Sequence, residues 1–324
     1  MSATEAPPSP GNGHVGQALR RKEDPRLIQG QASYVDDITL TGQLWAAWVR
    51  SPEAHAKIVS IDTSAAKARD GVLAVYTHED LDMEAGLPMA WVPPGVDVNT
   101  PEHWVLAKDE VKHVGDPVAL VIGHDRYGVV DAAEDVLVDY DPLPVVVDPE
   151  AALEDGSPLV HAQFGTNKVC EWSLGGGDLE AGFAEADHII ERRVVNHRIA
   201  GAAIEPRAVL AEYRGEKLTL WSSTQVPHFL RLFASILLGI SEERVRVIAP
   251  EVGGGFGSKL QIYAEEIGCA WNADSVPSSL KPTLTLSTWS RPWWVTIIPS
   301  ERVSTHLTGR PSLRDAHAQP ISSA

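Results

Sequence analysis

The sequence contains very little cysteine, and this excludes several kinds of metal and redox site. Cys170 and Cys269 are its only cysteines, and their spacing is not that of a CxxC pair. Two isolated thiols cannot ligate an iron–sulfur cluster or a structural zinc ion, so we expect both to be reduced and packed in the fold. The histidines form no HExxH motif. A metal ion held directly by side chains is therefore not expected.

Long apolar runs and an excess of basic residues are also absent. No run approaches the ~20 apolar residues that a transmembrane helix needs, so no membrane span is expected. The opening residues, MSATEAPPSPGNGHVGQ, lack the basic-then-apolar order of a secretory signal peptide, which favours a cytoplasmic protein. The net charge of −17 repels phosphate groups, so nucleic acid and anionic lipid surfaces are not expected as partners.

The hydrophobic pattern predicts an α+β fold that begins after a flexible tail at residues 1–17. A first domain at 18–148 mixes short strands with short helices and contains a proline-rich loop at 89–104. That loop is long enough to be functional or to face a partner. The predicted strands and helices of this domain are strands at 43–51, 56–62, 71–77, 116–123 and 136–147, and helices at 63–69 and 125–135.

A second, incomplete domain is predicted at residues 149–271. Asp178 is placed to cap a helix at 179–187, because its carboxylate can accept from the free amides of the first turn. Strands are expected at 188–198, 208–214, 217–224 and 244–250, and further helices at 226–241 and 260–271. In the helix at 226–241 the apolar stripe expected to be buried consists of Phe229, Phe233, Ile236, Leu237 and Ile240.

Residues 272–324 differ from the rest of the chain in composition. Of these 53 residues, 22 are serine, threonine or proline, and they include Trp289, Trp293 and Trp294. No part shows sustained helical periodicity, and prolines interrupt each candidate strand. We interpret this segment as an aberrant, disordered tail that follows a shift of reading frame.

The motif GGGFGSK at 253–259 follows a predicted strand. Its glycines allow the backbone to lie very close to a ligand or to a neighbouring part of the fold. Glycine permits positive φ and leaves no Cβ in the way of a ligand. A Walker A loop would need Gly-Lys-Ser/Thr, and here Ser258 precedes Lys259. A dinucleotide fingerprint would need glycine at position 258. A nucleotide site is therefore disfavoured, and a tight turn against a packed neighbour remains the alternative.

Two further segments place polar side chains where a site could form. Gln225 follows a predicted strand and precedes a helix, so its amide could contact a ligand or cap the helix. Glu205 and Arg207 flank Pro206, and a structural ion pair is the favoured interpretation for them.

Five segments in order resemble one family. They are GQALRRKEDPRLIQGQASYVDDI, GDLEAGFAEADHIIERRVVNHR, EPRAV, STQVPHFLR and GGGFGSK, and together they cover about residues 16–271. The family is that of the large, molybdenum-binding subunit of xanthine dehydrogenase, aldehyde oxidase and aerobic carbon monoxide dehydrogenase. GSKLQIYAEE looks most like the bacterial carbon monoxide dehydrogenase large chains.

The resemblance implies an α/β hammerhead domain, followed by the beginning of the first molybdenum-binding domain. It implies a molybdenum–molybdopterin cytosine dinucleotide cofactor and an oxidoreductase that hydroxylates a small-molecule substrate. Gln225 matches the glutamine that bonds a molybdenum oxo ligand, and Gly254, Gly255 and Phe256 match the loop beside the metal and pterin. Partner subunits carrying iron–sulfur clusters and FAD are implied as well.

Two departures from the family pattern limit this expectation. Leu260 stands where purine-oxidising relatives carry a glutamate, so a purine substrate is disfavoured. Family members are also more than twice as long, and nothing after Trp271 resembles them. No catalytic residue is assigned, because the general-base glutamate and the active-site loop belong to the missing half, and catalysis by this chain alone is not expected. The alternative is a non-catalytic fragment or interaction module from a disrupted gene.

Overall fold

The structure is a computed structural model that describes residues 16–89, 92, 94–275 and 284–286. Nearly all of the predicted N-terminal tail lies outside these residues. Most of the predicted C-terminal tail does too, including its three tryptophans at 289, 293 and 294.

The described residues contain both helices and strands, and nearly all strand pairs are antiparallel, as is typical of an α+β fold. The α-helices are α1 (Asp24–Leu27), α2 (Ser64–Ala68), α3 (Arg126–Glu134), α4 (Leu179–Glu185), α5 (Pro227–Leu238) and α6 (Ala264–Ser275). The strands of the first half are β1 (Trp45–Arg50), β2 (Ala56–Asp62), β3 (Val72–Tyr76), β4 (Glu110–Val111), β5 (Pro117–Gly123) and β6 (Leu137–Pro142). Those of the second half are β7 (Val209–Arg214), β8 (Lys217–Ser222), β9 (Val245–Ile248) and β10 (Leu284–Leu286).

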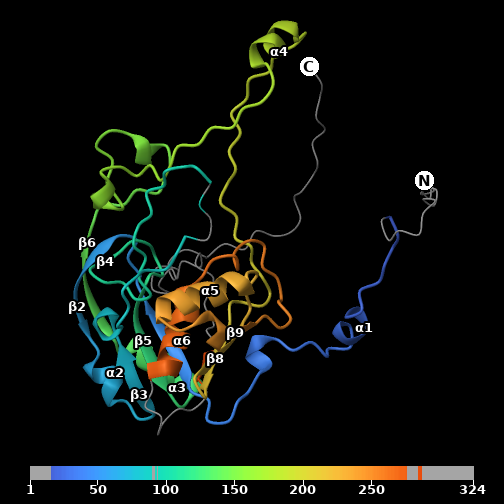
Figure 1. The fold of residues 1–324 in the computed structure, drawn as a ribbon. Coiled ribbons are helices and arrows are strands. Elements are labelled where there is room, and N and C mark those ends of the chain that lie inside the picture. The colour runs from blue at the N-terminus through green and yellow to red at the C-terminus, as the bar shows by residue number, and fades with distance from the viewer. Residues whose placement is uncertain (1–15, 90–91, 93, 276–283, 287–324) are drawn as a thin grey trace, which may run out of the picture.

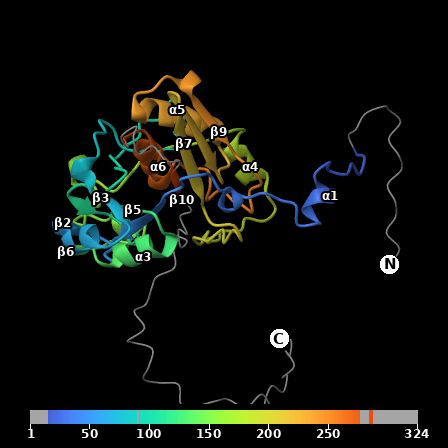
Figure 2. The same cartoon turned by 90° about the horizontal axis from the view of Figure 1, so that it is seen from below.

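The strands form three sheets (Figures 1 and 2). Two sheets belong to the first half, in the orders β1-β5-β3 and β4-β2-β6, and both are antiparallel. Strand β5, with the sequence PVALVIG, is buried along its whole length, as expected of an apolar run at the centre of a sheet. The third sheet has the order β10-β7-β8-β9, and its β8–β9 pair is parallel. The polypeptide between these two parallel strands forms α5, which packs on β9.

Helix α6 joins the two halves of the fold. It packs on β7 and β8, and its Gly268 faces β1 so closely that an added Cβ would lie 2.5 Å from the ring of Trp48. Trp271 packs edge-on against Tyr76 of β3, with ring centroids 5.2 Å apart. Leucines of β5 and β8 belong to one continuous apolar core with Ile267. The core therefore runs from the first half into the second, and α6 lies at its centre.

A buried ion pair reinforces the same junction. Arg50, at the end of β1, contacts Glu265 in the first turn of α6. Burial raises the pKa of the Glu265 carboxyl, but the Arg50 guanidinium outweighs this effect and holds the pKa below its usual range. A buried carboxylate is tolerated only with such a partner, so this contact fixes where α6 begins relative to the first half.

The structure confirms the α+β fold and most of the predicted elements, with three differences. The predicted strand at 188–198 is extended but pairs with no strand among the described residues. Helix α6 begins at Ala264 and continues to Ser275, and β10 pairs with β7, so regular structure extends beyond residue 271. On α5 the buried residues are Leu230 and Ala234, whereas Phe229 and Ile236 of the predicted stripe are 48% and 58% exposed.

Other local predictions agree with the structure. Pro227 occupies the first turn of α5, and Gly239 ends this helix with a φ of +64°. Asp178 caps α4 by accepting a hydrogen bond from the amide of Ala181 at 3.0 Å. Both cysteines are free thiols, but the expected packing holds only for Cys269, which is buried in α6, whereas Cys170 is half-buried. Within the described residues, no helix is long and apolar enough to cross a membrane.

The close approach of α6 to β1 predicts that Gly268→Ala destabilises the protein. The added methyl would overlap the Trp48 ring, and overpacking of this kind costs about 1–3 kcal/mol. The matched control is Gly182→Ala in α4, where no atom lies within 4 Å of an added Cβ. There the higher helix propensity of alanine should stabilise slightly or have no effect. Urea unfolding followed by circular dichroism measures both, and equal midpoints for the two variants would contradict the packing of α6.

Candidate functional site

Gln225 is bonded to the glycine-rich loop through its side-chain oxygen. Its Oε1 atom accepts hydrogen bonds from the backbone amides of Gly257, at 3.0 Å, and Lys259, at 3.3 Å. Its own backbone amide donates to the carbonyl of Lys259 at 2.9 Å. Because two N–H donors require the oxygen to face the loop, the Nε2 amide group must point the other way. No partner of Nε2 is recorded among the described residues, and Gln225 is exposed.

The loop itself presents three consecutive backbone amides without recorded partners in the described part of the chain. They belong to Gly254, Gly255 and Phe256. The amides on both sides are bonded: that of Gly253 donates to Glu205, and that of Gly257 donates to Gln225. A short run of free N–H groups in a loop rich in positive φ is a binding site for anionic oxygen.

The loop conformation depends on glycine at the point of contact with Gln225. A Cβ at Gly255 would lie 2.5 Å from the Gln225 side-chain oxygen, closer than any real contact. Gly254 has a φ of +106°, and Phe256 adopts a φ of +54° although it is not glycine. The Phe256 ring is 74% exposed and lies beside Gly254, where an added Cβ would meet it at 2.8 Å. The structure thus brings all four predicted residues, Gln225 and 254–256, to one place.

A buried lysine, Lys259, stabilises the loop through an ion pair with Glu205. The Lys259 side chain is 2% exposed, and its Nζ atom lies 3.0 Å from Oε2 of Glu205. The same carboxylate oxygen accepts the Gly253 amide at 2.6 Å. Burial lowers the pKa of the Lys259 ammonium below its usual range, against the opposing effect of Glu205. The pair therefore ties the first glycine of the loop to its last residue.

Arg207 pairs with Glu266 and not with Glu205, which is two residues away in the sequence. Its guanidinium lies 2.7 Å from Glu266 and over the ring of Tyr263, 3.8 Å from the centroid. Ser222 donates to the same Glu266 oxygen at 2.5 Å. Glu205 and Arg207 each take part in an ion pair, as expected, but they do not pair with each other: Glu205 pairs with Lys259 and Arg207 with Glu266. These contacts hold the end of β8, the loop and α6 together.

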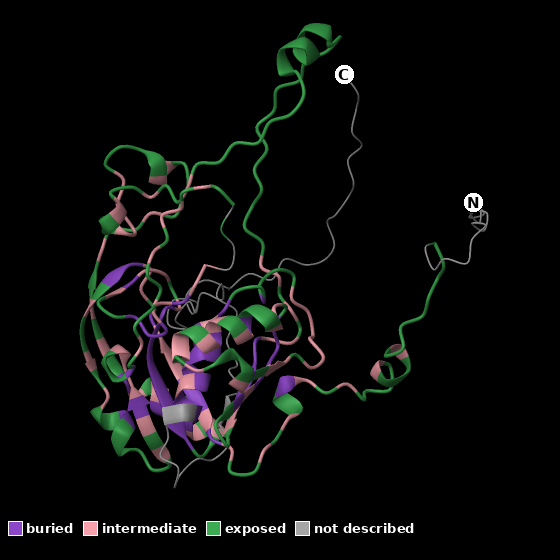
Figure 3. Cartoon of the chain, viewed as in Figure 1, coloured by how far each residue is buried: buried purple, intermediate pink, exposed green. Residues whose placement is uncertain are grey.

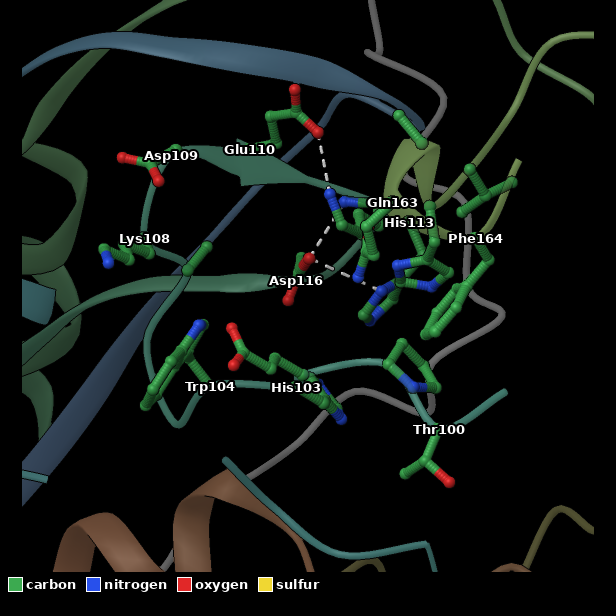
Figure 4. A pocket seen from close by; sticks show the side chains of 17 residues that line it. Thr100, His103, Trp104, Lys108, Asp109, Glu110, His113, Asp116, Gln163 and Phe164 are labelled. Carbon is green, nitrogen blue, oxygen red and sulfur yellow. Dashed lines mark hydrogen bonds and ion pairs between the residues drawn. The ribbon is translucent and has the colours of Figure 1, made fainter. Parts of the chain in front are cut away.

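A separate cavity of about 890 Å³ lies between the first half of the fold and the segment at 160–164 (Figure 4). The proline-rich loop, the strand region at 107–116 and the segment 160–164 line it. In Figure 4, Asp116 lies beside His113, with 3.6 Å between Oδ2 and Nδ1. Burial lowers the pKa of the His113 imidazole, although the Asp116 carboxylate opposes this. None of the four predicted site residues lines this cavity, and no group of side chains among the described residues could hold a metal ion.

The sequence alone does not predict that Lys259 supports the candidate site, although it does predict a role for the nearby residues 254–256. The lysine is part of the motif GGGFGSK, and the motif alone invites comparison only with a phosphate-binding loop. A lysine that follows a glycine loop, together with a glutamate before proline at 205–206, was the available signal. Only the fold brings these residues together, because 54 positions separate them along the chain.

Comparisons with known proteins agree with this arrangement. The aldehyde oxidase and xanthine dehydrogenase a/b hammerhead domain matches residues 29–144, and the molybdopterin cofactor-binding domain matches residues 160–288. The second match extends past Trp271, where the resemblance was expected to end. It includes β10, which lies in the sheet with β7.

Three relatives cover most of this chain. It is 38% identical to the nicotine 6-hydroxylase large subunit of Paenarthrobacter nicotinovorans, over 78% of this chain and 31% of that protein. It is 39% identical to the carbon monoxide dehydrogenase large chain of Afipia carboxidovorans, over 77% of this chain and 32% of that one. The crystal structure of quinoline 2-oxidoreductase from Pseudomonas putida 86 aligns with a TM-score of 0.74 at 31% identity, over 84% of this chain and 34% of that chain.

The chain spans about a third of the length of these relatives. Two domain matches follow one another in order, and solved structures of the same kind share the fold. The chain belongs to the xanthine dehydrogenase, aldehyde oxidase and carbon monoxide dehydrogenase family of molybdopterin-binding large subunits.

Proposed function

We propose that this chain forms the hammerhead domain and the first part of the molybdenum-binding region of a molybdenum hydroxylase large subunit. The observation that carries the proposal is the pairing of Gln225 with a loop that offers three backbone amides without a partner among the described residues. Gln225 and the amides of residues 254–256 are the proposed contacts to a molybdopterin dinucleotide. We keep the predicted division of the chain, with the hammerhead domain at 18–148, as part of this proposal.

The residues present fit such a cofactor. Anionic, oxygen-rich groups are bound well by backbone N–H groups that are already oriented in the fold. The Nε2 group of Gln225 would donate a further hydrogen bond to the cofactor from the end of β8. A Cβ at Gly255 would displace the Gln225 amide, so glycine keeps this contact open. When bound, the cofactor supplies the redox chemistry of hydroxylation at carbon.

The finer assignments rest on the relatives. The cytosine dinucleotide form of the cofactor is proposed from the likeness to carbon monoxide dehydrogenase large chains. Subunits with iron–sulfur clusters and with FAD are the proposed electron-accepting partners, because this chain has only two cysteines. Leu260 is 43% exposed beside the loop and offers no carboxylate, which argues against a purine substrate. Carbon monoxide, aldehydes and N-heterocycles other than purines are the proposed substrate classes, and a cytoplasmic location is proposed.

A non-catalytic interaction module is the second candidate function. It is favoured by a long exposed segment at residues 171–199, which no described part of the chain covers. Molybdenum content distinguishes the two, because a module without cofactor would contain neither metal nor pterin.

The orientation of the Gln225 amide predicts that Gln225→Glu loses cofactor without loosening the loop. Glutamate keeps an oxygen for the amides of Gly257 and Lys259, but it replaces the Nε2 donor with a negative charge. A hydrogen bond to a charged group contributes about 1.5–3 kcal/mol, so we expect molybdenum affinity to fall by roughly 10- to 150-fold. The measurement is molybdenum and pterin per mole of the full chain, purified from a host that makes molybdopterin.

Gln163→Ala is the matched control, because Gln163 lines the separate cavity of Figure 4. It should leave both the metal and the pterin content unchanged. Wild-type levels in Gln225→Glu together with a loss in Gln163→Ala would place the cofactor in the other cavity. Metal-free wild-type chain would contradict cofactor binding by this chain.

The contact of Gly255 with Gln225 predicts that Gly255→Ala also lowers cofactor content. The methyl would push the Gln225 side chain away from the loop amides, because it cannot approach the oxygen to 2.5 Å. We expect a loss of at least about tenfold in bound molybdenum, as for removal of one charged hydrogen bond. Gly175→Ala, where nothing lies within 4 Å, is the control. Equal metal content in the two variants would show that the Gly255–Gln225 contact does not matter for binding.

A further inference from the structure

A second segment of the chain, residues 201–205, lies along the glycine-rich loop. A Cβ added at Gly201 would lie 3.2 Å from Cβ of Phe256, near the far end of the loop. At the other end, the backbone amide of Glu205 donates to the carbonyl of Gly253 at 3.2 Å. The two segments therefore run side by side in opposite directions, and the backbone of 201–205 forms one wall of the loop.

Two residues other than glycine have left-handed backbone conformations where these segments meet. Ala202 has a φ of +43°, and Phe256 has a φ of +54°. Side chains disfavour this region of φ, so such a conformation persists only where the surrounding structure determines it. The loop and its wall must therefore be held in place by other contacts.

The Glu205 carboxylate contacts both ends of the loop through a single oxygen. Its Oε2 atom accepts the amide of Gly253 at 2.6 Å and the Nζ group of Lys259 at 3.0 Å. The other oxygen, Oε1, is buried and has no hydrogen-bond partner in the described part of the chain. Within these residues, the side-chain hydrogen bonds of Glu205 therefore all go to the loop.

The partner of this carboxylate is deeply buried. Buried residues gather in the sheets and in the helices that pack on them (Figure 3), and Lys259 is among the largest fully buried side chains. A buried ion pair contributes little more stability than packed apolar side chains of the same size, but it can fix one arrangement of the groups that it joins. Here those groups are the first glycine and the last residue of the loop.

We propose that Glu205 and Lys259 are positioning residues for cofactor binding: their contact holds the loop closed, so that the amides of residues 254–256 keep the orientation in which they donate to the cofactor. This inference rests on the proposed function given above. Without the contact, the cofactor would have to order the loop as it binds, and the conformational entropy lost in that step would lower its affinity.

Two variants separate positioning of the loop from stability of the fold. Glu205→Gln keeps an oxygen for the Gly253 and Lys259 donors, but it leaves the buried ammonium without an opposite charge. Glu205→Gln combined with Lys259→Met breaks the link between the loop ends and leaves no buried charge. We expect the single variant to lower the urea midpoint and keep the loop ordered. The double variant should unfold nearer the wild-type midpoint, with a loosened loop.

Nitrogen-15 relaxation by NMR measures the loop in the cofactor-free chain. For the amides of residues 254–256 we expect order parameters of about 0.85 in the wild-type chain and in Glu205→Gln, and below about 0.6 in the double variant. Molybdenum and pterin are measured in the same full-length chains from a host that makes molybdopterin. Their content should follow the order of the loop, and it should fall at least about tenfold in the double variant.

Lys112→Met is the matched control, because it removes a lysine whose Nζ lies 2.7 Å from Glu110 in the first half of the fold. It should change neither the order of the loop nor the cofactor content. Ordered loop amides in the double variant, or a cofactor content that follows the urea midpoint, would overturn the positioning role. If Glu205→Gln does not fold, the loop order of the double variant decides alone. A loosened loop in the double variant, with no metal in the wild-type chain, would support positioning of the loop and contradict the proposed function.

Discussion

The candidate site depends on one interaction, in which the side-chain oxygen of Gln225 accepts two backbone amides of the glycine-rich loop. This contact spans 32 and 34 residues of sequence and joins the end of β8 to the loop that follows β9. It also determines the orientation of the Gln225 amide, because only the oxygen can accept those two donors. The Nε2 donor of Gln225 and the three loop amides that have no partner in the described part of the chain thereby lie together.

Buried ion pairs fix Gln225 and the glycine-rich loop to the rest of the fold. Lys259 and Glu205 connect the two ends of the loop, and Arg207 with Glu266 connects the segment just before β7 to α6. Helix α6 is in turn fixed to the first half by Arg50 and by the Trp48 ring at Gly268. Each buried ion needs its partner because an unpaired charge in the interior is costly. The hammerhead half therefore helps to position a loop to which it contributes no residue.

The sequence predicted the parts of this fold that depend on local signals. Pro227 and Gly239 set the ends of α5, and the apolar run of β5 marked a central strand, because caps and buried strands have local signatures. The predictions were wrong where the pairing or burial of a segment depends on residues that are distant in the sequence. The stretch 188–198 has a strand pattern but forms no ladder with any described part of the chain, since pairing requires a second strand. On α5, Leu230 and not Phe229 is buried, because the neighbouring sheet and α6 decide which side is covered. Gln225 and the 254–256 loop were identified by resemblance, whereas the role of Lys259 required the fold.

The most direct test of the central contact is residue-resolved hydrogen exchange of the loop amides by NMR in the cofactor-free chain. The account predicts slow exchange for Gly257 and Lys259, which donate to Gln225, and fast exchange for Gly254, Gly255 and Phe256. In Gln225→Ala the first two amides should become as fast as the other three. Equally fast exchange of all five amides in the wild-type chain would contradict the account.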